Sequence, residues 1–208
     1  MNVALSDKSV IQEKQEDTGV HPQKFALWLA IASMTMFFAA LTSALLVKKG
    51  DYQVWENFEL PGIFKLSTAT IVLLSVCIHA SLISYRKAKF GLFRWLLFFS
   101  LLLGLAFLAM QVYGWEILKQ MGFPLTGNIA GSFIYLITAS HGVHIIGGLM
   151  VTLMFLFFAI RSRKDPIYEL RDVINPKRQL RLEMLVTYWH FVDAVWVYLY
   201  IFFLLNYQ

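Results

Sequence analysis

The sequence predicts an all-α polytopic membrane protein, a bundle of five transmembrane helices. Of its 208 residues, 58% are hydrophobic and only 15% are charged, which is too little charge to cover the surface of a water-soluble domain. The charged residues are also separated by long apolar intervals, and a helix needs about 20 mostly apolar residues to cross a bilayer. These observations exclude a disordered chain, a disulfide scaffold and a nucleic-acid-binding domain.

The N-terminal part of the chain predicts a polar tail followed by the first membrane helix. Residues 1–24 are polar and mixed in sign, without the short apolar stretch of a secretion signal. The first span covers residues 25–47, between Lys24 and Lys48, and is too long for the apolar part of a signal peptide. We therefore expect residues 25–208 to form a single transmembrane domain.

Four further apolar intervals are also long enough to cross a bilayer as helices. Pro124 and Gly127 mark a turn before the fourth of them, which is long enough to tilt in the bilayer. The single cysteine, Cys77, lies inside the second interval, where a small hydrophobic role is expected. The four spans are predicted over residues 66–85, 95–115, 129–160 and 184–206.

The distribution of basic residues predicts the orientation of the bundle. Fourteen of the 18 Lys and Arg residues fall in the N-terminal tail, the second loop and the fourth loop. With five spans, these three segments share one face of the membrane. Since cytoplasmic loops carry an excess of Lys and Arg, we expect the N-terminus in the cytoplasm and the C-terminus outside, in the periplasm.

Polar side chains inside the spans carry most of the functional information. His141 and His144 lie three residues apart in the fourth span, and His190 and Asp193 have the same spacing in the fifth. An unpaired carboxylate at mid-span costs roughly 2.5 to 3.5 kcal/mol on insertion scales, which makes Asp193 the most informative residue. Other polar or aromatic residues of interest in the spans are His79, Gln111, Tyr113, Tyr188, Trp189 and Trp196.

Three interpretations of these residues remain open from the sequence alone. They can form hydrogen bonds that hold helices together. One of His141 and His144 can face His190 and ligate a haem, as in a membrane cytochrome b. Asp193 and its neighbouring histidines can instead form a proton or ion path. A divalent metal site built from three histidines and Asp193 is conceivable, but no independent feature of the sequence supports it.

Several motifs resemble subunit III of haem-copper terminal oxidases. The stretch from Tyr188 through Trp189-His190-Phe191-Val192 to Asp193 resembles the last-helix signature of that family. His141-Gly142-Val143-His144, followed by Gly147-Gly148, resembles the motif of the preceding helix. Residues 24–47 and 104–111 are similar to two further shared helices. The resemblance covers about residues 22–205 and matches the short, five-helix bacterial form.

The resemblance implies an accessory subunit with no catalytic or redox centre of its own. We expect it in the bacterial cytoplasmic membrane, beside catalytic subunit I, subunit II and a small subunit, with haem and copper in those partners. Its implied role is to support assembly and turnover stability of an enzyme that reduces oxygen to water with electrons from cytochrome c or quinol. It also implies bound phospholipid, and a structural polar network of His141, His144, His190, Asp193, Tyr188, Trp189 and Gln111.

Other positions bear on lipid, proton and alternative roles. Lipid or interface contacts are expected at Trp196, Arg86, Arg94 and Arg181. Where many relatives have membrane acids linked to proton-related proposals, this chain has Met34 and Gly114, so a proton role is not carried over. An accessory subunit of a nitric oxide reductase and a transporter remain as alternatives, although the chain lacks the internal repeat of many transporters.

Overall fold

A computed structural model describes residues 22–51, 59–126, 129–162 and 175–207 of the chain. Each of its five long helices in the described residues has the length and apolar composition to cross a membrane, which confirms the predicted number of membrane helices. Residues 1–21, most of the predicted polar tail, lie outside the described residues. The helices are α2 (Pro22–Asp51), α3 (Ile63–Arg86), α4 (Phe90–Gln120), α5 (Ile129–Arg161) and α7 (Pro176–Tyr207).

Every helix extends beyond the apolar span predicted for it. α2 begins at Pro22 rather than at residue 25, and proline suits the first turn of a helix because the N–H groups there have no partner within the helix. α7 begins eight residues before the predicted span and contains Glu183 in its first part. Backbone hydrogen bonding therefore continues past the apolar segment to residues that can reach the headgroup region.

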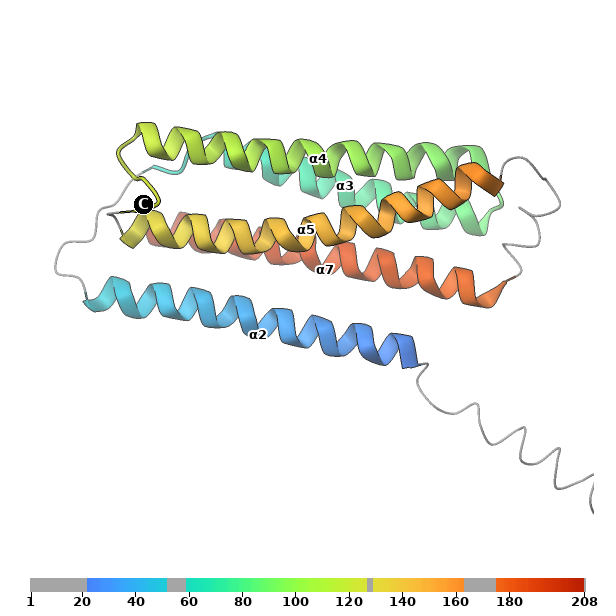
Figure 1. The fold of residues 1–208 in the computed structure, drawn as a ribbon, viewed down its shortest axis with the longest axis horizontal. Helices are drawn as coiled ribbons and strands as arrows, with labels where there is room; N and C mark the ends of the chain where they lie inside the picture. The colour runs from blue at the N-terminus through green and yellow to red at the C-terminus, as the bar shows by residue number, and fades with distance from the viewer. Residues whose placement is uncertain (1–21, 52–58, 127–128, 163–174, 208) are drawn as a thin grey trace, which may run out of the picture.

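Four of the helices form a ring, and the fifth packs outside it. α3 packs on α4, α4 on α5, α5 on α7, and α7 on α3, which closes the ring. α2 packs against α5 and α7 and lies on the far side from α3 and α4 (Figure 1). The core inside the ring includes Leu74, Phe107 and Trp196, each fully buried.

Small residues allow the helices of the ring to approach closely. A Cβ atom added to Gly148 of α5 would lie 3.0 Å from the Trp189 ring of α7. A Cβ added to Gly104 of α4 would lie 2.6 Å from a methyl group of Leu149 in α5. Apolar side chains gain little by leaving lipid for a protein interior, so close packing and interhelical hydrogen bonds must hold such a bundle together.

Candidate functional site

Three tryptophan side chains connect neighbouring helices through threonine hydroxyls. Trp189 of α7 donates from Nε1 to Oγ1 of Thr152 in α5 at 2.9 Å, and this hydroxyl donates to the carbonyl of Gly148 at 2.8 Å. An indole can only donate, whereas a hydroxyl that donates to its own helix still accepts. Both groups are thus satisfied without water. The arrangement recurs in the pairs Trp196–Thr68 at 3.0 Å and Trp115–Thr138 at 2.9 Å, where each hydroxyl again donates to a carbonyl one turn earlier.

His141 connects α5 to α7 from a completely buried position. Its Nε2 donates to the backbone carbonyl of Val192 at 3.2 Å. Its ring centroid lies 5.1 Å from that of Trp196 and 5.6 Å from that of Phe107. Its Nδ1 has no hydrogen-bond partner within the described part of the chain. The imidazole is therefore enclosed by aromatic rings, with one nitrogen used as a tie between helices.

Two tyrosine hydroxyls of α7 bind the backbone of α5. Tyr188 donates to the carbonyl of His144 at 2.8 Å, and Tyr207 donates to the carbonyl of Ala130 at 2.8 Å. His144 itself donates from Nδ1 to the carbonyl of Ser140 in its own helix. Its side chain thus makes no hydrogen bond to α7, and only its backbone takes part in the tie.

Gln111 belongs to a separate contact between α3 and α4. Its Nε2 donates to the hydroxyl of Ser67 at 3.2 Å, while its Oε1 has no partner among the described residues. One turn away on α4, a Cβ on Gly114 would lie 3.0 Å from the ring of Phe64. Gly114 therefore packs directly against α3, where a carboxylate side chain would require the rings to move. Met34, the other position without the family acid, is buried in α2.

A second cluster lies between α3 and α7, on the outside of the ring. Nδ1 of His190 lies 2.6 Å from the hydroxyl of Ser75, and Nε2 of His190 lies 3.1 Å from Nδ1 of His79. These three side chains line an open groove of about 350 Å³. Two turns closer to the helix ends, Arg86 and Glu183 form an ion pair at 2.8 Å. The polar network predicted from the sequence did not include His79.

Asp193 lies near this second cluster but is not tied to it. The residue is buried, and neither carboxylate oxygen has a hydrogen-bond partner among the described residues. Ser75 of the second cluster is a polar neighbour of the Asp193 carboxyl group. No histidine or aromatic hydroxyl of the described chain holds Asp193, contrary to the single network that the sequence led us to expect.

The predicted polar residues therefore divide into separate sites. His141 of α5 and Trp189 of α7 join these two helices, whereas His190 of α7 faces α3 and contacts His79. The structure does not bring His141 and His190 together as opposing ligands of one haem. Among the described residues, no group of three His, Cys, Asp or Glu side chains is placed to hold a metal ion.

The residues expected to make lipid or interface contacts differ in their burial and in their partners. Trp196 is completely buried, so its position inside the ring does not fit the expected lipid or interface contact. Arg86 pairs with Glu183, and Arg94 donates to the carbonyl of Ala159 at 3.5 Å. Arg181 is exposed and lines a cavity between helices.

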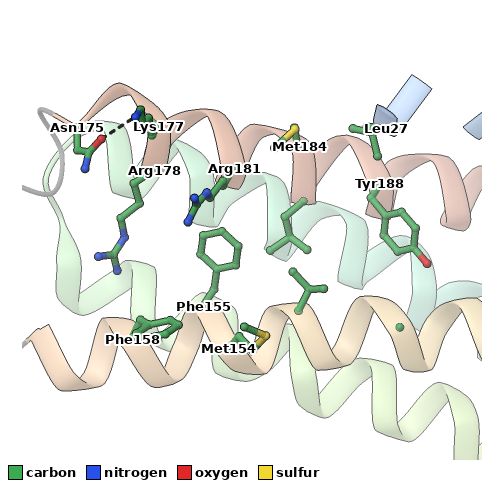
Figure 2. Close-up of a pocket in the computed structure, with 13 residues that line it drawn as sticks. Leu27, Met154, Phe155, Phe158, Asn175, Lys177, Arg178, Arg181, Met184 and Tyr188 are labelled. Atoms are coloured by element: carbon green, nitrogen blue, oxygen red, sulfur yellow. Dashed lines mark hydrogen bonds between the residues drawn. The ribbon is translucent and has the colours of Figure 1, made fainter. Parts of the chain in front are cut away.

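This cavity lies between α2, α5 and α7 and has a volume of about 860 Å³. Figure 2 shows Arg178 and Arg181 on α7 above Phe155 and Phe158 of α5. The basic residues that line the cavity lie near the start of α7, and Tyr188 lies further along that helix. The remaining lining is mostly apolar and includes Leu27, Val151, Met154, Met184 and Leu185.

The fold and these contacts define a polytopic helical membrane protein whose interior polar groups serve mainly to join helices. Comparison with known proteins identifies its family. The family model described as cytochrome c oxidase subunit III matches residues 8–207, and the chain belongs to this family. It is an accessory subunit III of a haem-copper oxidase.

Curated relatives match over most of their length. "Probable cytochrome c oxidase subunit 3" of Nocardia farcinica is 32% identical over 82% of this chain and 80% of that protein. "Cytochrome c oxidase subunit 3" of Bacillus subtilis is 29% identical over 83% of this chain and 81% of that protein. The protein of the same name from Thermostichus vulcanus is 28% identical over 86% of each chain.

Proposed function

We propose that this subunit packs beside catalytic subunit I, with subunit II and a small subunit in the same complex, and keeps the oxidase assembled during turnover. Haem and copper would reside in those partners, which reduce oxygen to water. The observation that carries this proposal is the use of Trp189, Trp196, Trp115 and His141 as ties between helices. A rigid, internally tied bundle is suited to support a neighbouring protein.

The proposed location is the bacterial cytoplasmic membrane, with the N-terminus in the cytoplasm. α3 ends and α4 begins at the same end of the bundle as the start of α7 (Figure 1). This end carries Arg86, Arg94, Arg161 and Arg181, whereas the opposite end carries Lys48, Lys49, Lys65 and Lys119 among the described residues. Together with the basic residues of the connecting segments, this asymmetry supports the proposed orientation.

Co-purification tests the functional proposal. The full chain, carrying an affinity tag and expressed in its native membrane, should bring haem and copper with it in mild detergent. The expected result is a haem absorption spectrum and copper in stoichiometric amounts, together with the larger catalytic subunit. If the chain instead purifies alone, or with a haem that it holds without other subunits, the accessory role is wrong.

We also propose that the cavity between α2, α5 and α7 binds a phospholipid. Its apolar lining fits an acyl chain, and Lys177, Arg178 and Arg181 lie at the end where a phosphate group would be at headgroup depth. Arg181→Ala should reduce the amount of retained anionic lipid measured by native mass spectrometry of the complex. The control is Trp95→Phe, an exposed residue of α4 outside the cavity. Equal lipid content in both variants would contradict the proposal.

A further inference from the structure

The groove between α3 and α7 presents a polar group to a region where lipid offers no partner. His79 is exposed, and its Nδ1 faces His190. Its other nitrogen, Nε2, has no hydrogen-bond partner within the described residues. The surrounding surface of the groove is formed by Val76, Ala80 and Ile83. An imidazole nitrogen left unpaired in hydrocarbon is costly, so this nitrogen requires a partner from another molecule.

The depth of His79 excludes a lipid headgroup as that partner. His79 precedes Arg86 by seven residues on α3, and His190 follows Glu183 by seven on α7. At 1.5 Å per residue, the histidine pair lies about 10 Å deeper along the helices than the ion pair. Acyl chains reach this depth but neither donate nor accept a hydrogen bond. The occupant must therefore bring a polar group into the hydrocarbon region, as a transmembrane protein helix does.

The internal hydrogen bonds of the groove define what this helix must carry. Ser75 and His79 occupy both ring nitrogens of His190, so His190 is already satisfied. Of the four ring nitrogens of this histidine pair, only Nε2 of His79 remains without a hydrogen-bond partner among the described residues. A neutral imidazole carries one donor and one acceptor, and the tautomer of His79 decides which of them Nε2 offers. A hydroxyl or carboxamide side chain can match either form.

We propose that the α3–α7 groove docks a transmembrane helix of a partner subunit, which places a hydroxyl or carboxamide group against Nε2 of His79. This inference rests on the proposed function, since it supplies the surface through which the subunit joins its complex. Ala80 allows close approach of the partner backbone, as small residues do at helix interfaces in membranes. Val76 and Ile83, both exposed in this chain, would be covered in the complex.

A photo-crosslinking experiment on the intact complex tests the groove directly. A benzophenone amino acid replaces Val76 in the groove or, as control, Leu105 on the outer face of α4. The two residues are matched in exposure, at 59% and 56%, and in depth, at about 15 Å from Arg86 and 17 Å from Arg94. The Val76 probe should crosslink to a second membrane polypeptide, identified by mass spectrometry, in much higher yield than the Leu105 probe.

The outcomes separate this inference from the proposed function. A complex that contains haem and copper, but in which the Val76 probe labels only lipid or detergent, overturns the docking site and leaves the oxidase role intact. A preparation without haem, in which Val76 still crosslinks to a polypeptide, supports the docking site and overturns the proposed partners.

Substitutions of His79 provide a second, independent measurement. His79→Leu should accelerate loss of the subunit from the complex in detergent by about 3- to 20-fold, as expected for one interhelical hydrogen bond. His79→Gln retains a donor and an acceptor and should restore much of the retention. Tyr113→Phe, which removes an exposed hydroxyl from α4, serves as control. Equal retention of the wild-type and His79→Leu chains would overturn the role of His79.

Discussion

The face of α7 toward α5 and the face toward α3 use similar residues in different ways. On the α5 side, His141 and Trp189 are completely buried, and their bonds to the opposite helix lie inside the chain. On the α3 side, His190 is only partly buried, and its partner His79 is exposed at the surface of a groove. A histidine therefore serves as an internal tie where neighbouring helices enclose it, and as a contact for another molecule where they do not.

We expect the largest loss of stability when side-chain volume is added on the face of α7 toward α5, which neighbouring helices enclose. We call this the closed face, and the face toward α3 the open face. Gly148→Val would place atoms within 3.0 Å of the rings of Trp189 and Tyr188, and rigid rings cannot yield as a flexible side chain can. We expect a loss of about 1 to 3 kcal/mol in the free energy of unfolding, typical of overpacking. The measurement is helicity of the isolated chain during titration with a denaturing detergent.

The adjacent residue supplies the control for this substitution. Gly147 is exposed, and a Cβ there would come no closer than 3.7 Å to the hydroxyl of Tyr188. Gly147→Val should therefore leave the unfolding transition nearly unchanged. If both variants lose equal stability, the general cost of valine in this helix, and not the packing of α5 on α7, is responsible.

The indole tie on the closed face predicts a smaller effect. Trp189→Phe removes the hydrogen bond to Thr152 and should lower the free energy of unfolding by about 0.6 to 2 kcal/mol. Thr152→Val removes the same bond from the other side. If the tie is real, the double variant should lose less than the sum of the two single variants. Strict additivity would show that the indole contributes through its volume alone.

Hydropathy and charge spacing sufficed to predict the number and order of the helices. The length of each apolar interval locates a span, but it does not set where the helix ends. α2 and α7 continue past their apolar spans because polar residues remain helical outside the hydrocarbon. The ends of these helices were therefore the part of the fold that the sequence predicted least well.

The division of the polar residues into two sites was not predictable in the same way. A membrane helix is apolar on all sides, so its pattern does not indicate which face meets which neighbour. Adjacent residues on a helix are about 100° apart, so Trp189 and His190 must face different helices. The partners Thr152, Thr68 and Ser75 are common residue types in membrane helices, and only their distances to the indole and imidazole nitrogens identify them.

The ion pair at the end of the α3–α7 contact should have the smallest effect on the free energy of unfolding. Arg86 and Glu183 lie 2.8 Å apart, with 49% and 29% of their side chains exposed. Water and salt screen a pair of this kind, so Arg86→Ala should cost about 0.2 to 1 kcal/mol in the isolated chain, and less at high salt. Exchanging the two residues, with Arg86→Glu and Glu183→Arg together, should restore most of the loss. A loss above 2 kcal/mol that is insensitive to salt would mean that this end of the α3–α7 groove is as tightly closed as the α5 side, and would remove the contrast between the two faces.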